Sequence, residues 1–529
     1  MIRIQDNDKK INQILFWLLA ISAVVRGIAA TSIEFGNDEV YYWTYALYPD
    51  WSHFDHPPMV GWMIQLFSLN LLFDSEFFIR LASVVFMTAN TYIIFRIGKD
   101  IKNAQTGLYA ALLYTSSVYA FVITGIFIMP DTPLMLFWLL AVWMAVRSLS
   151  LSKGQFILFF GLFAGLAMLS KYSGVFLWVG MALYILIFNR KQLKNPYLYL
   201  SLLISAICCI PILYWNLQNG FISFNFHGDR VSLFGKPNLG YFGAELAGEM
   251  LYNNSVNFVL AIIAVIAAFK GRLTMEKNAL RLVLCIALPL ILTFIFFSLT
   301  RQTLPHWNAP AYSILILLSA CWICEKNPQS NGSFRLPKSI IAALCVLILT
   351  VGIGIAEINT GFIPLDHHSE PEMLGRNDFT LDMYGWRQLE MKFAALREQK
   401  ITEGEMKKDD GIVADEWFPL ANLDYYVARP LGMKVMGVGY IEKLHKYLWI
   451  NEQRGGFTKG EDFWFLTDSR YLKNPEGLYP GGFEAIIPID TITIERGGKP
   501  AKNFFVYACK GLIYMQPTVS ETIEKNKAK

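Results

Sequence analysis

The feature that most constrains this chain is a succession of long apolar segments. A helix needs about 20 mostly apolar residues to cross a bilayer. About eleven segments of this kind occur, near residues 11–33, 77–97, 105–127, 132–149, 155–169, 173–188, 197–217, 254–270, 279–299, 306–324 and 338–357. A shorter apolar stretch near 57–73 is expected to form an interfacial or re-entrant helix. This pattern predicts a polytopic α-helical membrane protein.

The composition excludes several other classes of protein. Of the 529 residues, 54% are hydrophobic and 17% are charged, whereas soluble domains carry about 25% charged residues. The 46 basic and 42 acidic residues nearly cancel, which leaves a net charge of +4. A simple soluble protein, a disordered chain and a small disulfide scaffold are therefore excluded. A nucleic-acid binder that depends on gross charge is excluded as well.

Basic residues recur in alternate connections between the predicted spans, and such residues concentrate on the cytoplasmic side of a membrane. With eleven spans, all of these basic groups fall on one side. They are Arg3, Lys9 and Lys10; Arg96, Lys99 and Lys102; Arg147 and Lys153; Arg190, Lys191 and Lys194; Lys270, Arg272, Lys277 and Arg281; and Lys326, Arg335 and Lys338. We expect a multi-pass protein of the cytoplasmic (inner) membrane, with a cytoplasmic N-terminus and an exported C-terminal part.

The character of the chain changes after about residue 358, because charge rises and no further long apolar run occurs. Short β-type runs alternate with helical patterns near Tyr384–Gln399 and Tyr440–Asn451, as in a small α/β domain. The predicted strands are Gly411–Ala414, Lys434–Val438, Phe463–Thr467, Ala485–Ile489 and Phe504–Ala508. We predict a transmembrane domain over residues 1–358 and a soluble periplasmic α/β domain over residues 359–529.

Ionisable residues gather in the connections predicted to lie outside the cell membrane. The first of these, residues 34–76, is called the first loop below and contains Asp38, Glu39, Asp55 and His56. The later ones carry Pro130-Asp131-Thr132-Pro133, Ser170-Lys171-Tyr172, His227-Gly228-Asp229-Arg230 and the run from Arg301 to Trp307, which includes His306. Ionisable groups at membrane depth are expensive and usually functional, so the outer face is the predicted functional face.

Each of these residues also has a purely structural explanation. Asp131 precedes Thr132-Pro133 and fits a helix N-cap. Lys171 fits a lysine that extends its charge to the membrane surface. Tyr41 and Tyr42 fit an aromatic belt at the membrane interface. The residues alone leave these explanations open beside the functional ones.

Such a face has the groups needed for transfer from a lipid-phosphate donor. A carboxylate accepts a proton from an acceptor hydroxyl, and cations hold the phosphate of the leaving group. The sequence has no phosphate-binding GxxxxGK[ST] motif and no GxGxxG motif followed by an acidic residue, so a cytoplasmic nucleotide site is not expected. No metal or other cofactor is expected; a divalent cation at His53, Asp55 and His56 is the weaker alternative.

A set of motifs in this order resembles a known family. The motifs are Asp38-Glu39 followed by Tyr41-Tyr42; Phe54-Asp55-His56-Pro57-Pro58; Pro130-Asp131-Thr132-Pro133; Leu169-Ser170-Lys171-Tyr172; and Leu304-Pro305-His306-Trp307-Asn308-Ala309-Pro310-Ala311-Tyr312. Over roughly residues 10–320 the chain resembles the membrane glycosyltransferases of the GT-C fold. The resemblance is closest to the bacterial relatives of dolichyl-phosphate-mannose protein mannosyltransferases and of aminoarabinose transferase, which modifies lipid A.

The resemblance implies a sugar donor linked to polyprenyl phosphate and direct displacement with inversion. The acceptor it implies is a hydroxyl or phosphate of an envelope glycolipid or glycan, reached from outside. Asp38 corresponds to the proposed catalytic base, with Glu39 beside it, and Asp131 corresponds to an active-site partner. The expected phosphate-binding residues are Lys171, His56, Arg230, Arg301 and His306. The expected substrate-binding residues are Tyr41, Tyr42, Asp55 and Tyr172. The implied interactions are with the membrane, the donor and the acceptor, and not with nucleic acid.

Two departures from the family pattern limit what the resemblance implies. His56 stands where aminoarabinose transferases tend to have lysine, which puts the identity of the donor sugar in doubt. The C-terminal part matches only through Met383-Tyr384-Gly385-Trp386 and Asp415-Glu416-Trp417. The alternatives are a protein O-glycosyltransferase and a transporter or flippase for lipid-linked sugars, although the chain shows no repeated halves. The active-site hypothesis requires Asp38, Asp131 and Lys171 to converge beside one lipid-accessible cavity.

Overall fold

The structure is a computed structural model, and it describes residues 2–151, 155–230, 236–327, 336–514 and 516–527. Contacts divide the chain into two compact units, which are described separately. The first, called the helical unit, comprises Met1–Ala30, His56–Asn216 and Ser223–Val351. The second, called the mixed unit, comprises Thr31–Asp55, Leu217–Ile222 and Gly352–Lys529.

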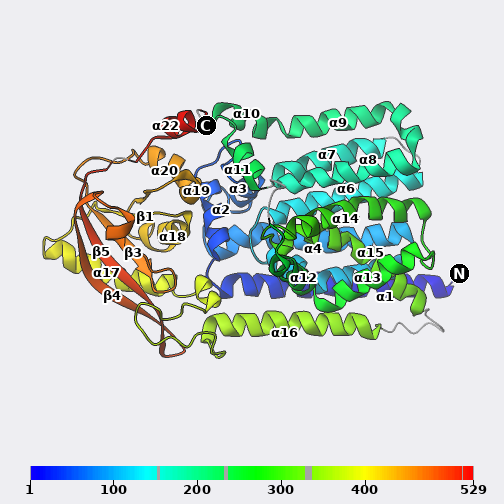
Figure 1. Ribbon diagram of the computed structural model, residues 1–529. Helices are drawn as coiled ribbons and strands as arrows, with labels where there is room; N and C mark the ends of the chain where they lie inside the picture. Colours follow the sequence, from blue (N-terminus) through cyan, green and yellow to red (C-terminus); the bar gives the residue numbers. More distant parts are fainter. Residues whose placement is uncertain (1, 152–154, 231–235, 328–335, 515, 528–529) are drawn as a thin grey trace. The chain divides into compact units, whose positions relative to one another are not determined.

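The helical unit consists of helices joined by short connections (Figure 1). Three of its α-helices, α1, α10 and α16, continue into the mixed unit, and α11 begins there. The α-helices are α1 (Ile2–Ser32), α3 (Met59–Phe67), α4 (Glu76–Ile101), α5 (Ala104–Ser116), α6 (Asp131–Leu151), α7 (Gln155–Ser170), α8 (Phe176–Phe188), α9 (Pro196–Cys208), α10 (Ile210–Gln218), α11 (Ile222–Arg230), α12 (Leu239–Tyr252), α13 (Ser255–Phe269), α14 (Lys277–Ser298), α15 (Ala309–Lys326) and α16 (Lys338–Thr360). A π-helix, η1 (Tyr119–Ile123), and the 3₁₀ turns η2 (Tyr172–Val175), η3 (Arg190–Lys194) and η4 (Pro305–Asn308) complete it.

All of the predicted apolar segments are helical, and the predicted fold class is confirmed. Among the residues that the structure describes, six helical segments are individually long and apolar enough to cross a membrane. The number rises to eight if each of two bent pairs, α9 with α10 and α12 with α13, is one span. The helices α7 and α8 are apolar but shorter, in agreement with the short predicted segments 155–169 and 173–188. The number of eleven crossings stays a prediction. The stretch near 57–73 forms the short helix α3.

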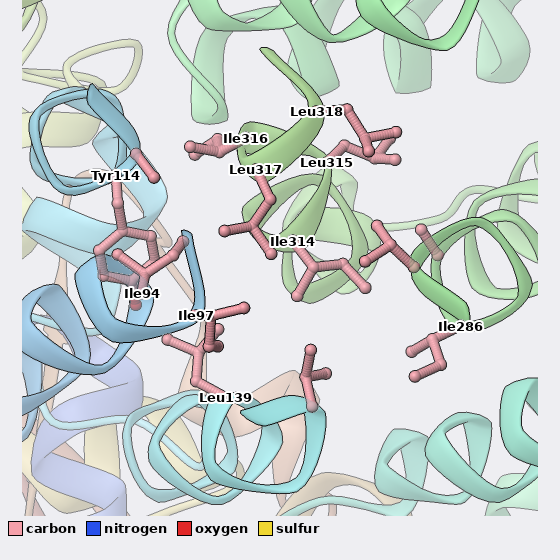
Figure 2. Packing of buried hydrophobic residues seen from close by; sticks show 14 of the residues in the cluster. Ile94, Ile97, Tyr114, Leu139, Ile286, Ile314, Leu315, Ile316, Leu317 and Leu318 are labelled. Carbon is pink, nitrogen blue, oxygen red and sulfur yellow. The ribbon is translucent and has the colours of Figure 1, made fainter. Parts of the chain in front are cut away.

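Helix α15 lies at the centre of the helical unit. Its residues Ile314–Leu318 pack against side chains of α4, α5, α6 and α14, among them Ile94, Tyr114, Leu139 and Ile286 (Figure 2). Other parts of the chain bury almost all of the apolar segment that contains α15, whereas they cover only a small part of α16. Because α15 is apolar on all sides, it is suited to a central position.

Glycines allow several helices of this unit to approach closely. A Cβ atom on Gly161 of α7 would lie 2.3 Å from the carbonyl oxygen of Ser201 in α9. A Cβ atom on Gly180 of α8 would lie 2.4 Å from the Cα atom of Ile286 in α14. Small residues at such crossings are the usual means of packing helices in a membrane, where apolar side chains gain little by leaving lipid.

The mixed unit is built around a five-stranded sheet with the order β2-β1-β3-β5-β4. The parallel strands β1, β2 and β3 continue into an antiparallel pair, β5 and β4 (Figure 1). The strands are β1 (Gly411–Ala414), β2 (Val435–Gly437), β3 (Phe463–Asp468), β4 (Phe483–Arg496) and β5 (Lys499–Leu512). The helices are α2 (Asn37–Leu47), α17 (Trp386–Thr402), α18 (Trp417–Asn422), α19 (Ile441–Leu444), α20 (Tyr447–Gln453), α21 (Pro475–Leu478) and α22 (Val519–Lys527), with the 3₁₀ turn η5 (Phe379–Met383) and the π-helix η6 (Leu423–Ala428).

The predicted C-terminal α/β architecture is confirmed, because each predicted strand coincides with an observed one. Every residue of β1 and β3 is buried, as expected for central strands covered on both faces. The helical pattern near Tyr440–Asn451 corresponds to two short helices, α19 and α20, which are separated at His445. The backbone of His445 has φ 51° and ψ −127°, and such a residue interrupts an α-helix.

Part of the first loop belongs to the mixed unit, which composition did not indicate. The carboxylate of Glu34 accepts hydrogen bonds from the backbone N–H groups of Trp386 and Arg387 at 2.9 and 3.1 Å. The N–H of Phe35 donates to the hydroxyl of Tyr426 at 2.6 Å. These bonds join the start of the loop to residues more than 350 positions away. The domain boundary between residues 358 and 359 stays a prediction.

The close approach of α8 and α14 gives a stability prediction. Replacing Gly180 by valine forces α8 away from Ile286, and overpacking of this kind costs about 1–3 kcal/mol. We expect a lower thermal unfolding temperature in detergent for Gly180→Val. Gly354→Val in α16 is the matched control, since a Cβ atom there meets nothing within 4 Å. Equal unfolding temperatures for the two variants would contradict the packing at this crossing.

Candidate functional site

A buried ion pair joins two of the predicted site residues in the helical unit. Lys171 Nζ lies 2.7 Å from Asp131 Oδ2, and the Tyr119 hydroxyl donates to Asp131 Oδ1 at 2.8 Å. Asp131 is 1% exposed and Lys171 is 9% exposed. Both carboxylate oxygens are therefore occupied, one by a cation and one by a neutral donor.

Three different backbone arrangements bring this group together. Asp131 is the first residue of α6, and Tyr119 lies in the π-helix η1, a type of helix often found at functional sites. Lys171 has an extended backbone between α7 and η2. The tight turn that follows needs Gly174, where a Cβ atom would lie 2.5 Å from the backbone of Ala167.

These contacts do not support the structural explanations given above for Asp131 and Lys171. The oxygens of Asp131 accept hydrogen bonds from Lys171 and Tyr119 and not from the helix N-terminus, so Asp131 is no N-cap in this structure. Lys171 is buried and paired, so it does not extend toward the membrane surface.

His306, predicted to bind phosphate, belongs to the same electrostatic group. It interacts with the charges of both Asp131 and Lys171, and it lies in the 3₁₀ turn η4, which precedes α15. Arg301 lies in the turn after α14 and is partly buried. The side chain of Arg230 lies outside the described part of the chain. The helical unit therefore brings three predicted residues together: Asp131, Lys171 and His306.

Two buried acids that sequence reasoning missed hold the segment around His306. Glu245 and Glu249 lie one turn apart on α12 and are 1% and 0% exposed. Glu245 accepts from the Thr303 hydroxyl at 2.7 Å, and Glu249 accepts from the Tyr312 hydroxyl at 2.9 Å. The amide of Asn308 donates to both carboxylates. The four-residue spacing, which places two acids on one helix face, was the signal available in the sequence.

A second small cluster in the helical unit contains two further predicted residues. The ring centre of His227 lies 4.9 Å from that of Tyr172 and 6.3 Å from that of His56. The Tyr172 hydroxyl is 2.9 Å from Ser223 Oγ. This cluster connects His56 of the first loop, the turn after α7 and helix α11.

The paired acids of the first loop have different environments in the mixed unit. Both lie in the first turn of α2, where the helix dipole stabilises a carboxylate. Glu39 is buried and accepts a hydrogen bond from the backbone N–H of Gly36 at 3.0 Å, which closes the start of the helix. Asp38 is exposed on the unit's surface. Of the two acids, Asp38 is thus the more exposed.

Asp55 is the centre of a buried aromatic cluster. Its Oδ1 accepts hydrogen bonds from the hydroxyls of Tyr41 at 2.7 Å and Tyr45 at 2.6 Å. Burial raises the pKa of both tyrosines well above the usual value, and the charge of Asp55 adds to this effect, so both remain proton donors. His445 Nδ1 is 4.0 Å from Asp55 Oδ2, and the ring of Tyr42 packs against those of Tyr41 and Tyr45.

The predicted residues thus form separate groups in the two units. The convergence of Asp38 with Asp131 and Lys171 involves both units and stays a prediction. Within the described ranges, no three His, Cys, Asp or Glu side chains are arranged to hold a metal ion. Independence of cofactors also stays a prediction from the sequence.

Comparison with known proteins gives matches along most of the chain. Residues 55–215 match the family described as dolichyl-phosphate-mannose-protein mannosyltransferase. The lipid A galacturonosyltransferase RgtD of Rhizobium johnstonii is 21% identical over 411 residues, which cover 76% of this chain and 81% of that protein.

The fold is shared with two crystal structures of ArnT from Cupriavidus metallidurans. The structure bound to undecaprenyl phosphate matches with a TM-score of 0.61 and 13% identity, covering 93% of this chain and 97% of that one. The apo structure matches with a TM-score of 0.60 and 12% identity, covering 94% and 98%. The resemblance predicted from the sequence is confirmed: the chain has the GT-C fold of membrane glycosyltransferases.

The ion pair between Asp131 and Lys171 gives a second stability prediction. Lys171→Met leaves the buried Asp131 carboxylate without its cation, and removing one partner of a buried pair costs about 3–5 kcal/mol. The double variant Asp131→Asn with Lys171→Met removes both charges, so we expect it to lose much less stability. Thermal unfolding of the purified proteins in detergent measures both effects. A double variant as unstable as the single one would contradict a charge-dependent role.

Proposed function

We propose that this protein transfers a sugar from a polyprenyl-phosphate donor to a lipid A-like envelope glycolipid, at the outer face of the cytoplasmic membrane. The observation that carries the proposal is the buried pair of Asp131 and Lys171 with His306 beside it. Placing charge among membrane helices is expensive, and a lysine fixed in this way is suited to an anionic phosphate.

The relatives support the two substrate classes. One structure with this fold holds undecaprenyl phosphate, which supports a lipid-linked donor. RgtD is a lipid A galacturonosyltransferase, which supports a glycolipid acceptor. The family matched by residues 55–215 contains protein mannosyltransferases, so a protein acceptor is the second candidate.

The proposed reaction is a direct displacement. Asp38 accepts the proton of the acceptor hydroxyl, the acceptor oxygen attacks the anomeric carbon, and the bond from that carbon to the phosphate oxygen breaks. Polyprenyl phosphate leaves with the bonding electron pair, and Lys171 neutralises its growing charge. The configuration at the anomeric carbon is inverted, and no covalent enzyme intermediate forms.

The remaining predicted residues support these steps in the proposal. Asp131 orients Lys171 by accepting its hydrogen bond through Oδ2. Tyr119 orients Asp131 in turn by donating to Oδ1. His306 adds a polar group beside the phosphate. Arg301, Arg230 and His56 are further proposed phosphate ligands.

The proposed substrate-binding residues divide into two environments. Tyr172 lies in the turn directly after Lys171, and we propose that it contacts the donor. Tyr41, Tyr42 and Asp55 are buried among one another, so we propose that they shape the first loop around the acceptor. Glu39 fixes the start of the helix that carries Asp38.

A reconstituted assay tests the proposed function directly. Purified protein is incubated with a polyprenyl-phosphate sugar and a lipid A acceptor, and released polyprenyl phosphate and the acceptor mass are measured. Transfer predicts both products, whereas a flippase moves the donor across a vesicle membrane without cleaving it. Mass spectrometry of envelope lipids with and without the protein identifies the acceptor, and a modified protein in place of a lipid would favour the second candidate.

Asp38→Asn is expected to abolish sugar transfer, because an amide cannot accept the acceptor proton. The loss of a positioned general base corresponds to roughly 100- to 10,000-fold in rate. Folding and donor binding are expected to stay close to wild type, since Asp38 lies at the surface of its unit. Asp74→Asn, also in the first loop, is the control. Transfer near the wild-type rate would remove Asp38 from this role.

Lys171 is expected to act on the donor more than on the acceptor. We compare Asp131→Asn with the double variant Asp131→Asn and Lys171→Ala, so that no buried carboxylate is left unpaired. The double variant should have a higher KM for the donor and a lower kcat, with little change in the KM for the acceptor. Unchanged donor kinetics would contradict a phosphate-binding role for Lys171.

A further inference from the structure

Lys446 joins the C-terminal segment to the first loop inside the mixed unit. It lies between α19 and α20 and is 4% exposed. Its ammonium donates to the backbone carbonyl of Tyr48 and lies 3.1 Å from His53 Nδ1. The same ammonium lies 4.7 Å from the centre of the Tyr45 ring. All three partners belong to the first loop.

This buried cation has no ion-pair partner among the residues that the structure describes. Its hydrogen-bonding partners are a carbonyl and an imidazole, and the charges of Asp50 and Asp55 act on it only from a greater distance. Burial of a charge without a counter-charge is unfavourable. Consistent with this, burial lowers the pKa of Lys446 well below its usual value. A methionine or leucine at this position would be the more stable choice.

The residue before Lys446 is strained as well. His445 has a backbone φ of 51° and ψ of −127°, which is unfavourable for a residue with a side chain. The imidazole ring stacks on Trp417 with an interplanar angle of 18° and a centroid distance of 5.8 Å. The next peptide N–H, that of Lys446, donates to the Tyr41 hydroxyl at 3.3 Å. Backbone strain of this kind persists where the surrounding contacts require it.

These contacts act on the helix that carries Asp38. Helix α2 ends at Leu47, and Tyr48 caps its C-terminal end. Lys446 contacts α2 through Tyr41 and its end through Tyr48, while the Phe35 N–H bond to Tyr426 fixes the chain just before it. Both ends of α2 are thus attached to the C-terminal segment.

We propose that Lys446 is a positioning residue, which holds helix α2 and residues 48–55 in the arrangement that presents Asp38 to the acceptor. The catalytic consequence rests on the proposed function, whereas the ordering of the loop does not. The unfavourable burial of Lys446 is then retained because the loop needs a donor at this point.

The test compares Lys446→Met with Lys443→Met in the full-length protein. Methionine has a similar length but neither charge nor donor, and Lys443 is three residues away with a side chain that is 51% exposed. Backbone hydrogen exchange over residues 37–55, the unfolding temperature and the transfer kinetics are measured for each. Lys446→Met should exchange faster over residues 37–55 and transfer roughly 10- to 100-fold more slowly. Its kcat should fall while the donor KM stays close to wild type.

A purely structural role predicts a different set of results. If Lys446 only stabilised the fold, the unfolding temperature and the activity would fall together. Our proposal expects Lys446→Met to unfold at the same temperature as wild type or higher, with lower activity. Lys443→Met should change neither exchange over residues 37–55 nor transfer.

The pH dependence of stability gives an independent readout. Because the pKa of Lys446 is lowered on folding, the unfolded chain binds the proton more tightly and stability rises with pH up to the usual value of 10.5. Methionine lacks this proton, so its advantage in unfolding temperature should be largest at low pH and shrink toward about pH 10. His53, Asp50, Asp55, Tyr41 and Tyr45 also face this site, and all remain present in both proteins.

A second variant keeps the proposal falsifiable if Lys446→Met does not fold. Lys446→Gln retains a donor for the Tyr48 carbonyl without the charge, and hydrogen exchange over residues 37–55 in this variant should stay close to that of the wild type. Unchanged exchange over residues 37–55 in Lys446→Met, or equal loosening in Lys443→Met, would overturn the proposal. Loosening of the loop in a protein without transferase activity would instead remove the proposed function and leave the positioning role.

Discussion

The ion pair between Asp131 and Lys171 is the interaction on which the helical unit's candidate site depends. A lone carboxylate or ammonium among apolar helices would be far too costly, so each of these groups requires the other. The pair in turn requires the π-helix that supplies Tyr119 and the tight turn that contains Gly174. Two local irregularities of the bundle thus contribute to the placement of the two charges.

The two buried acids on α12 are held by neutral hydrogen-bond donors. Glu245 and Glu249 accept hydrogen bonds from Thr303, Asn308 and Tyr312, and these residues flank the turn that contains His306. Gly248 lies on the same face, where a Cβ atom would meet the ring of Pro305 at 2.1 Å. Helix α12 therefore fits closely against the segment that contains His306, whose ring is influenced by the charges of Asp131 and Lys171.

Much of the fold could be predicted from the sequence because apolar periodicity is a local property. The apolar segments near 77–97 and 279–299 are helices, and the strands at Gly411–Ala414 and Phe463–Thr467 are where alternation and β-branched or aromatic residues place them. The pairing of Asp131 with Lys171 was within reach, since both belong to motifs at the predicted outer face. The attachment of Thr31–Asp55 to the C-terminal segment was not, because bonds such as that from Phe35 to Tyr426 leave no periodic signal. The strain at His445 was hidden for the same reason, since only tertiary contacts require it.

Each of the two units buries a basic side chain at a cost in stability. In the helical unit a paired charge is buried at the predicted donor site. In the mixed unit Lys446, which has no ion-pair partner among the described residues, is buried against the first loop. Replacing buried charged groups by apolar ones of similar volume is often neutral or stabilising. A loop that carries a general base must be held to within a fraction of an ångström during transfer. A buried donor attached to a backbone carbonyl provides that restraint, whereas a methionine would fill the same space without directing the chain.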